Sequence, residues 1–229
     1  MPAPQLTKQV IQRKSLGEEI VDALQRDIIG GKFQPGQRIV ERELIERFGV
    51  SSIPIREALL ELENRGLVVR RRNRGCSVIQ LTPKEAARIC ELRRVLEPKV
   101  MEWAAERVTP RAAEQLHRQM KRVQAAANNQ DLAAFFQEDL KLHQLMWEVA
   151  DNIYAARMLE TALGSLFASG LISSRESKTI DFLAAADKHW RLLRAICDGD
   201  RQRAALSLLE VAAEFETHLT CKLAMVTGK

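Results

Sequence analysis

The sequence lacks the features that mark membrane, secreted and disulfide-stabilised proteins. No apolar run reaches the roughly 18 charge-free residues that a membrane-spanning helix needs, and the N-terminus, MPAPQLTKQV, lacks the apolar core of a secretory signal. The cysteines lie far apart without a CxxC pair, which argues against a cysteine-built zinc site and favours a reducing compartment. They are Cys76, Cys90, Cys197 and Cys221. We therefore expect a cytoplasmic protein with no membrane partner.

The positive charge of the chain is concentrated in its first third. The 229 residues are 46% hydrophobic and 28% charged, with a net charge of +5, a composition typical of globular proteins. Residues 1–81 hold 14 Lys and Arg against 10 Asp and Glu, whereas residues 82–229 hold 21 against 20. A small basic module attached to a near-neutral body predicts a polyanionic partner for the module. Composition alone does not distinguish a nucleic acid from an anionic membrane surface.

Residues 15–66 have the pattern of three short helices. Apolar residues recur at helical spacing from Leu16 to Ile29, and Ser15 and Glu18 stand three apart, as in a capping box. Glycines follow each of the three segments, as they commonly do at helix ends. The expected helices are 16–29, 41–48, and a third that begins at Ser51 or Ser52 and closes at Gly66.

A basic hairpin is expected after the third helix. Two short β-rich segments, 67–70 and 76–81, flank the turn RRNRG at 71–75. Two helices joined by a tight turn and followed by such a hairpin, or wing, form a winged helix-turn-helix, whose later helix (the recognition helix) enters the major groove of DNA. An arginine cluster is more often a solvated surface, but its place beside this motif favours DNA. We expect Arg65 to be an ordinary surface charge.

The same region resembles the N-terminal domain of GntR-type bacterial repressors. The resemblance covers about residues 15–80, with the segment GGKFQPGQRIVERELIERFGVSSIPIREALLELENRGLVVRRRNRGCSVI. It implies that Arg42, Arg56 and the wing tip Arg74-Gly75 approach DNA. The family commonly has Arg-Thr where this chain has Ser52-Ile53, so a base-reading arginine is missing from the turn.

These predictions assign a role to each candidate DNA-contacting residue. Arg56, exposed one turn into the recognition helix, offers its guanidinium to guanine, and Arg42 reaches a base edge or a phosphate. The wing arginines pair with backbone oxygens, and the wing glycine permits a close approach to the groove. The predicted set is Arg42, Ser52, Arg56, Arg71, Arg72, Arg74 and Gly75.

Residues 82–229 have the pattern of an all-α bundle. Thr82-Pro83-Lys84-Glu85 has the form of a capping box with proline in the first turn, and we place the domain boundary between residues 81 and 82. No β pattern occurs and the connections are short, as in antiparallel bundles. The expected fold class is therefore mainly α, a winged helix-turn-helix followed by a bundle. Its helices are expected near 83–108, 110–127, 131–150, 153–173, 180–197 and 200–220.

This second region is similar to the FCD effector domain that follows the winged helix in the FadR branch of the family. The matching pieces are ELRRVLEP at 91–98, EDLKLH at 138–143, and the stretch from His189 to Asp200. The resemblance covers about residues 82–215. It implies a bundle of six or seven helices with a central cavity, where an Asp and three His commonly hold a divalent metal. Small carboxylates often act as effectors there.

Three residues are candidate metal ligands. Asp139 and His143 stand four apart and share a helix face, and His189 falls where the resemblance implies a second histidine. The last histidine is expected at position 211, which is Val211, and the flanking Glu210 and Glu214 would need to rotate to point inward. His218 lies two turns further on and would be too distant unless the register shifts. Three protein ligands with a water or an effector still hold zinc, and the ligand types suit Zn²⁺, Ni²⁺ or Mn²⁺. The alternative is a structural role, in which Asp139 and His143 form a pair on the helix surface and His189 is a core side chain whose hydrogen bonds are satisfied.

Two residues are candidate effector contacts. A buried Arg93 facing the cavity would bind a carboxylate in a bidentate manner, and the alternative is a structural ion pair with Glu97, one turn further on. Trp190, beside His189, would line the pocket, although the tryptophans as a set fit a packed core.

We predict a ligand-responsive transcription regulator, a repressor rather than an enzyme. Effector or metal binding in the bundle would shift two winged helices in a homodimer and change their affinity for a short palindromic operator on double-stranded DNA. The alternative is a metal-dependent hydrolase or lyase that uses Asp139, His143 and His189, but GxSxG, HExxH and Gly-rich phosphate motifs are missing. A third hypothesis is a protein that packs DNA without sequence preference, since Ser52 replaces the usual arginine.

Overall fold

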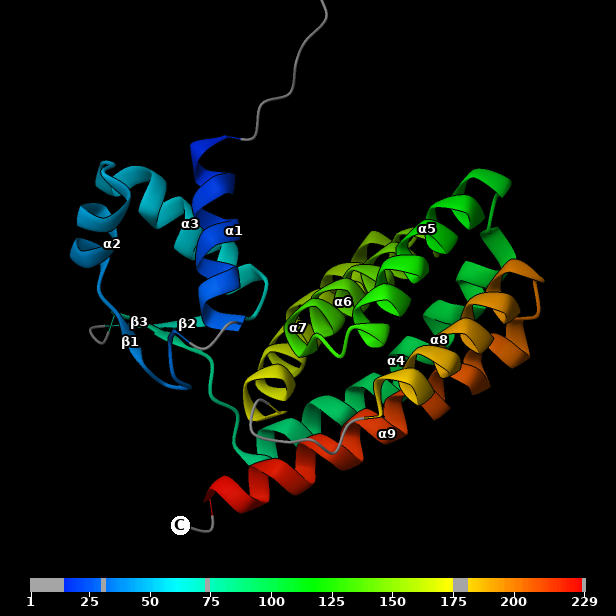
Figure 1. Ribbon diagram of the computed structural model, residues 1–229. Helices are drawn as coiled ribbons and strands as arrows, with labels where there is room; N and C mark the ends of the chain where they lie inside the picture. The colour runs from blue at the N-terminus through cyan, green and yellow to red at the C-terminus, as the bar shows by residue number, and fades with distance from the viewer. Residues whose placement is uncertain (1–14, 30–31, 73–74, 175–180, 228–229) are drawn as a thin grey trace, which may run out of the picture.

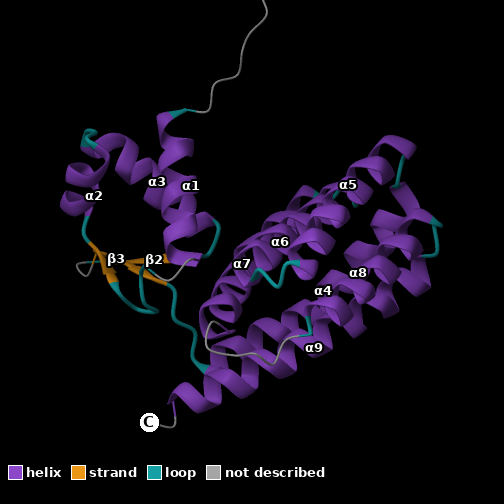
Figure 2. Ribbon diagram, viewed as in Figure 1, coloured by secondary structure: helices purple, strands orange, loops and turns teal. Residues whose placement is uncertain are grey.

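The chain forms two packed units, each with its own apolar core. The computed structural model describes residues 15–29, 32–72, 75–174 and 181–227. Residues 171–174, 214, 218 and 220–227 are described by their backbone alone. A small unit of helices and a short sheet precedes an elongated helical bundle (Figure 1). Strands occur only in the first unit among the described residues (Figure 2). The predicted mainly α fold is confirmed.

The first unit contains the three predicted helices. In the capping box that begins the first, the Ser15 N–H donates to Glu18 at 2.7 Å and the Glu18 N–H donates to Ser15 Oγ at 3.2 Å. Gly49 ends the second helix in a left-handed conformation, with φ 64°, which glycine adopts without steric cost. The helices are α1 (Leu16–Ile29), α2 (Glu41–Phe48) and α3 (Ser52–Asn64).

The wing belongs to a three-stranded antiparallel sheet of order β1-β3-β2. The strands are β1 (Arg38–Ile39), β2 (Val68–Arg71) and β3 (Gly75–Val78). β1 was not predicted, because two residues are too short for an alternating pattern. β3 ends three residues earlier than predicted, since the chain leaves the sheet after Val78 on its way to the bundle.

The bundle consists of six helices among the described residues. Thr82 forms the predicted capping box with Glu85, whose N–H donates to Thr82 Oγ1 at 3.2 Å. The last helix continues beyond the predicted end at Thr220, and no described helix is long and apolar enough to cross a membrane. The helices are α4 (Pro83–Arg107), α5 (Pro110–Asn128), α6 (Leu132–Val149), α7 (Ile153–Ser174), α8 (Phe182–Cys197) and α9 (Arg201–Thr227).

The bundle core lies between long neighbouring helices. α4 packs along α9, α5 packs against α6 and α8, and α7 packs against α4, α6 and α9. The core side chains include Met101, Leu116, Met120, Leu142 and Trp147, all at most 2% exposed. Because α6 and α8 both pack against α4 and α5, side chains from α6 and α8 meet inside the bundle. These side chains form the polar cluster described below.

The two units meet where α3 ends against α7. A Cβ atom at Gly66 would lie 2.7 Å from Ser165 Oγ and 2.9 Å from the carbonyl carbon of Gly164, so the contact requires glycine at that position. The neighbouring Arg65 donates to Glu61 at 2.8 Å and to Gln25 at 2.9 Å. The prediction of Arg65 as an ordinary surface charge is therefore wrong, because its half-buried guanidinium ties α3 to α1.

Candidate functional site

Exposed arginines lie on the helices and strands of the first unit that the sequence assigns to DNA. The side chain of Arg42 on α2 is 84% exposed and that of Arg56 on α3 is 65% exposed. Arg71 and Arg72, at the end of β2, are exposed, and Ser52 is half-buried in the first turn of α3. Arg74 lies outside the described residues.

The guanidinium of Arg56 is held by an acidic neighbour on α2. Arg56 Nε donates to Glu41 at 2.9 Å, which leaves both terminal nitrogens of the guanidinium available to an external acceptor. Arg70 Nη2 donates to the backbone oxygen of Arg56 at 3.3 Å, and the Arg70 N–H donates to Glu63 at 2.9 Å. These bonds fix the first strand of the wing against the recognition helix.

One wing arginine was missed by the sequence analysis. Arg38, on β1, is exposed, and its guanidinium Nε lies 3.6 Å from the place of a Cβ atom at Gly75. Gly75 has φ +77°, in the left-handed region that favours glycine. Arg38 lies beside the wing because β1 pairs with β3. This pairing could not be predicted, since a two-residue strand has no alternating pattern in the sequence.

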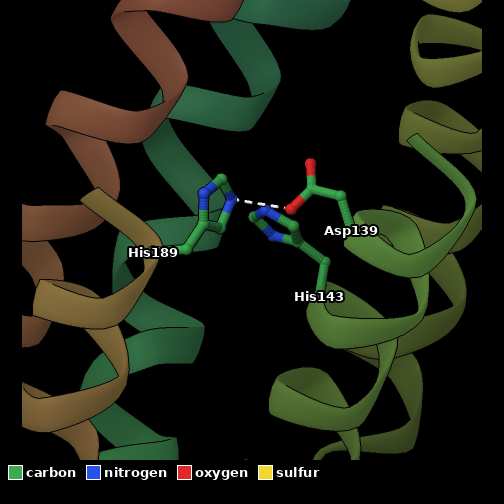
Figure 3. A group of neighbouring side chains, drawn as sticks. All are labelled: Asp139, His143 and His189. Atoms are coloured by element: carbon green, nitrogen blue, oxygen red, sulfur yellow. Dashed lines mark ion pairs between the residues drawn. The ribbon is translucent and has the colours of Figure 1, made fainter. Parts of the chain in front are cut away.

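A second candidate site lies inside the bundle. Asp139 and His143 project from adjacent turns of α6 toward His189 of α8 (Figure 3). One ligand atom from each lies within 4.8 Å of the others. The three residues are 6%, 0% and 4% exposed, so the alternative of a pair on the helix surface is wrong. The structure brings together the three residues that the sequence selected.

The hydrogen bonds of His189 define where its protons lie. His189 Nδ1 is 2.8 Å from the backbone oxygen of Ala185, which only accepts, so Nδ1 carries a hydrogen. His189 Nε2 is 2.7 Å from Asp139 Oδ1 (Figure 3). Two acceptors do not approach so closely without a cation between them. In the ligand-free protein that cation is a proton on His189.

Electrostatics within this pair agree with a protonated His189. Burial by itself would lower the pKa of His189, but the Asp139 carboxylate and the hydrogen bonds outweigh it and raise that pKa. Burial likewise would raise the pKa of Asp139, but the attraction of His189 dominates and lowers that pKa. The buried ion pair therefore stabilises the charged form of both side chains.

His143 is bonded to a residue that the sequence analysis did not place in the site. His143 Nδ1 lies 2.7 Å from Glu97 Oε1 on α4. Glu97 also accepts from Arg93 Nε at 2.6 Å and from Trp147 Nε1 at 3.1 Å. Burial would raise the pKa of Glu97, but Arg93 and His143 lower it to about 2. The ion pair between Arg93 and Glu97, predicted as the alternative to an effector contact, is present. Glu97 also bonds to His143 and so connects this ion pair to the three candidate ligands.

The donor set fits a divalent metal. His143 Nε2 and Arg93 Nη1 are buried without a hydrogen-bond partner, and the buried Asp139 Oδ1 and His189 Nε2 contact only each other, at 2.7 Å. Two imidazole nitrogens and a carboxylate oxygen are ligands that Zn²⁺, Ni²⁺ and Mn²⁺ accept, and buried polar atoms without partners are costly unless a ligand satisfies them. The three residues would hold the metal, and Arg93 is connected to His143 through Glu97.

Two other predicted positions contribute no ligand here. Val211 is buried in the bundle core, and the Glu210 side chain is 61% exposed near Arg191.

Trp190, a predicted effector contact, donates from Nε1 to Gln124 on α5 at 3.0 Å. The described contacts of Trp190 thus lie on α5 rather than on the three ligand candidates.

Both units of the chain match known protein families. The family described as bacterial regulatory proteins, gntR family, matches residues 16–78. The FCD domain matches residues 88–213, which is more than half of the chain.

Curated relatives are transcription regulators. The HTH-type transcriptional repressor RspR of Escherichia coli K12 is 31% identical over 136 residues, which cover 59% of this chain and 60% of that protein. The HTH-type transcriptional regulator Mce2R of Mycobacterium tuberculosis is 30% identical over 231 residues, covering 89% of this chain and 92% of its own. The galactonate operon transcriptional repressor of Escherichia coli K12 is 27% identical over 215 residues, covering 84% and 93%.

Solved structures share the fold. The Escherichia coli protein McbR/YncC superimposes with a TM-score of 0.74 at 21% identity, over 88% of this chain and 95% of that chain. A transcription regulator from Rhodococcus sp. RHA1 gives a TM-score of 0.70 at 18% identity, over 89% and 96%. The relatives are regulators, which contradicts the alternative of a hydrolase or lyase. The chain belongs to the GntR family of bacterial regulatory proteins, with an FCD domain after its helix-turn-helix.

Proposed function

We propose that this chain is a ligand-responsive repressor. Residues 1–81 would bind double-stranded DNA, and residues 82–229 would bind a divalent metal and a small carboxylate effector. The observation that carries the DNA-binding part is the side chain of Arg56 on α3, which is 65% exposed while its Nε donates to Glu41. A guanidinium in this arrangement matches the O6 and N7 acceptors of guanine in the major groove.

The wing would add contacts that do not depend on base sequence. Arg38, Arg71 and Arg72 are exposed on or directly after the strands of the wing sheet, and phosphate contacts from such residues would position the protein on DNA without reading the bases. Ser52 supplies a hydroxyl where the family commonly has arginine, so base recognition would rest mainly on Arg56 and Arg42.

The effector part rests on a cluster of buried polar atoms, in which Asp139 Oδ1 and His189 Nε2 contact each other at 2.7 Å and His143 Nε2 and Arg93 Nη1 have no hydrogen-bond partner. Asp139, His143 and His189 would hold a metal, which supplies a positive centre that attracts an anion. Arg93 Nη1 would bind a carboxylate of the effector through a charge-assisted hydrogen bond. The names of two relatives, repressors of galactonate and gluconate operons, support a small organic acid as the effector class.

A homodimer would match a palindromic operator. Leu92 and Val95 stand three residues apart on α4 and are 40% and 77% exposed, although apolar side chains at helical spacing usually face a core or a partner. We propose that this face takes part in the contact between two copies. Sedimentation of the full chain and of Val95→Asp tests this, because a dimer that shifts toward monomer in the variant supports the assignment and an unchanged dimer contradicts it.

Two measurements test the proposed function directly. Selection of binding sites from random DNA should return a short palindrome, and recovery of no preferred site would favour the DNA-packing hypothesis instead. Elemental analysis of the purified protein, with a thermal-shift screen of small organic acids, tests the effector part. A ligand at about 100 times its Kd adds roughly 2.7 kcal/mol of stability, so absence of any shift across galactonate, gluconate, citrate and lactate would contradict a carboxylate effector.

A further inference from the structure

We propose that Glu97 is a positioning residue of the metal and effector site. It fixes which nitrogen of His143 carries the proton, and it orients the guanidinium of Arg93. This inference rests on the proposed function and names the residue that prepares the site for its ligands.

His143 differs from the other two histidines whose side chains the structure describes. His117 and His189 each bond through Nδ1 to the backbone oxygen four residues earlier on their own helix, both at 2.8 Å. His143 Nδ1 instead bonds to Glu97, 46 residues away on α4. The orientation of His143 therefore depends on a side chain and is open to substitution, whereas the orientation of the other two depends on the backbone.

The chemistry of Glu97 determines the tautomer of His143. Glu97 is fully buried and receives donors from both α4 and α6. An ionised carboxylate only accepts, so His143 Nδ1, 2.7 Å from Glu97 Oε1, must carry a hydrogen. With one hydrogen on the ring, the lone pair then resides on Nε2, a buried atom without a hydrogen-bond partner. His143 belongs to the group of three residues whose ligand atoms lie within 4.8 Å of one another. Outer hydrogen bonds of this kind commonly fix the ligating nitrogen of a histidine.

The same carboxylate orients Arg93. Glu97 Oε2 engages Arg93 Nε, while Arg93 Nη1 remains buried without a partner. The guanidinium also lies over the Phe167 ring, with Cζ 5.8 Å from its centroid. One buried acid thus connects the histidine that would hold the metal with the arginine that would hold the anion, and a change at Glu97 should affect both.

Two variants test whether Glu97 acts by positioning His143 and Arg93 or only through its own size and charge. In Glu97→Gln the permanently charged Arg93 would retain the amide oxygen as its acceptor, so the amide NH₂ would face His143. Donation from that NH₂ to Nδ1 moves the hydrogen of His143 to Nε2. The double variant Arg93→Met/Glu97→Leu removes both buried charges together and leaves no uncompensated ion, so it remains informative if Glu97→Gln fails to fold.

The primary readout is the tautomer of each histidine in the metal-free full-length protein. Long-range proton–nitrogen NMR of ¹⁵N-histidine-labelled protein should show the Nδ1–H form for His143 in the wild type, the Nε2–H form in Glu97→Gln, and a mixture in the double variant. His117 serves as the internal reference, because its Nδ1 bond to the backbone oxygen of Ala113 is retained. A wild-type His143 in the Nε2–H form, or an unchanged tautomer in both variants, would overturn the proposal.

Chelator competition with Zn²⁺ provides the second readout. Loss of the outer partner of a metal-bound histidine typically weakens binding by about 10–100-fold, and we expect that loss in both variants. Equal Zn²⁺ affinity in all three proteins would overturn the role of Glu97 in preparing the site. If the wild type binds no Zn²⁺ while the tautomer changes as described, the metal part of the proposed function fails and the positioning of His143 by Glu97 stands.

Discussion

Gly66 and Gly164 are in backbone contact across the junction of the two units. Gly66 follows the recognition helix α3 with φ +70°, and Gly164 lies within α7. A Cβ atom at Gly164 would lie 2.8 Å from the carbonyl carbon of Arg65, closer than real Cβ atoms come to a backbone. The junction therefore depends on the absence of two side chains, and α3 ends directly on the FCD domain.

The first prediction concerns Gly164→Ala. The added methyl group cannot be accommodated without moving the backbone at Arg65, so we expect the two units to separate. The helix itself should remain intact, since alanine favours it by about 1 kcal/mol over glycine. Faster proteolysis of the connection at 79–82, with bundle helicity unchanged, would show the separation. Gly17→Ala is the control, because its Cβ would lie 3.8 Å from Ser15 Oγ, an ordinary van der Waals contact.

The same variant should alter the response to ligand. α7 also carries Phe167, whose ring centroid is 5.6 Å from that of His143, so one helix contacts both the polar cluster and the junction. We expect Gly164→Ala to reduce the change in operator affinity that Zn²⁺ produces in the wild type, while Zn²⁺ affinity stays the same. An unchanged Zn²⁺ response of the operator affinity would show that α7 does not connect the two sites.

The second prediction separates base reading from phosphate contact. Arg56→Ala should cost roughly 1–3 kcal/mol in operator binding and relax the preference at one base pair, whereas Arg71→Ala should weaken all DNA sequences similarly and lower the salt dependence. Binding isotherms on operator and random DNA at several salt concentrations provide the comparison. Equal losses on both DNAs for Arg56→Ala would contradict a base-reading role.

The third prediction concerns a buried acid that joins α1 to α2. The Asp27 side chain is 7% exposed, lies 2.7 Å from Lys32 Nζ and forms an ion pair with Arg47. Asp27→Asn should destabilise the first unit by about 1–3 kcal/mol, as expected for loss of a buried charged acceptor. Amide hydrogen exchange in α1 to α3 measures this. The exposed pair of Arg42 and Glu46 supplies the control, since Glu46→Gln should change stability by less than about 1 kcal/mol.

The difference in stability between the wild type and Asp27→Asn should decrease as the pH falls. Burial raises the pKa of Asp27, but Lys32 and Arg47 outweigh burial and lower it below the value of the unfolded chain. The stabilisation is therefore complete above the unfolded pKa of about 3.9 and is lost as the pH falls through the lower, folded value. Wild type and Asp27→Asn should converge in acid, and a difference that persists there would contradict the ion pairs as its origin.

The sequence predicted local structure well and long-range contacts poorly. The capping boxes at Ser15 and Thr82 and the glycine at 49 identify helix ends within a few residues, because each acts on its own helix. The partnership of Glu97 with His143 depends on the rotation of α4 against α6, which no short-range pattern encodes. The Gly66–Gly164 contact likewise depends on how two units meet, and Arg38 was missed because β1 has only two residues.

The fourth prediction uses the opposite effects of pH on the ligand-free and metal-bound protein. The raised pKa of His189 means that its proton stabilises the ligand-free fold fully below the unfolded pKa of about 6.5, and that this stabilisation is lost as the pH rises through the folded value. A metal needs the same Nε2 lone pair, so protons compete with it and metal affinity should increase with pH. The gain in melting temperature on adding Zn²⁺ should therefore grow from about pH 6 to about pH 8. In Asp139→Asn the carboxylate that raises the pKa of His189 is gone, so both the pH dependence and the Zn²⁺ effect should decrease, and a Zn²⁺ effect that is constant with pH in the wild type would exclude His189 as a ligand.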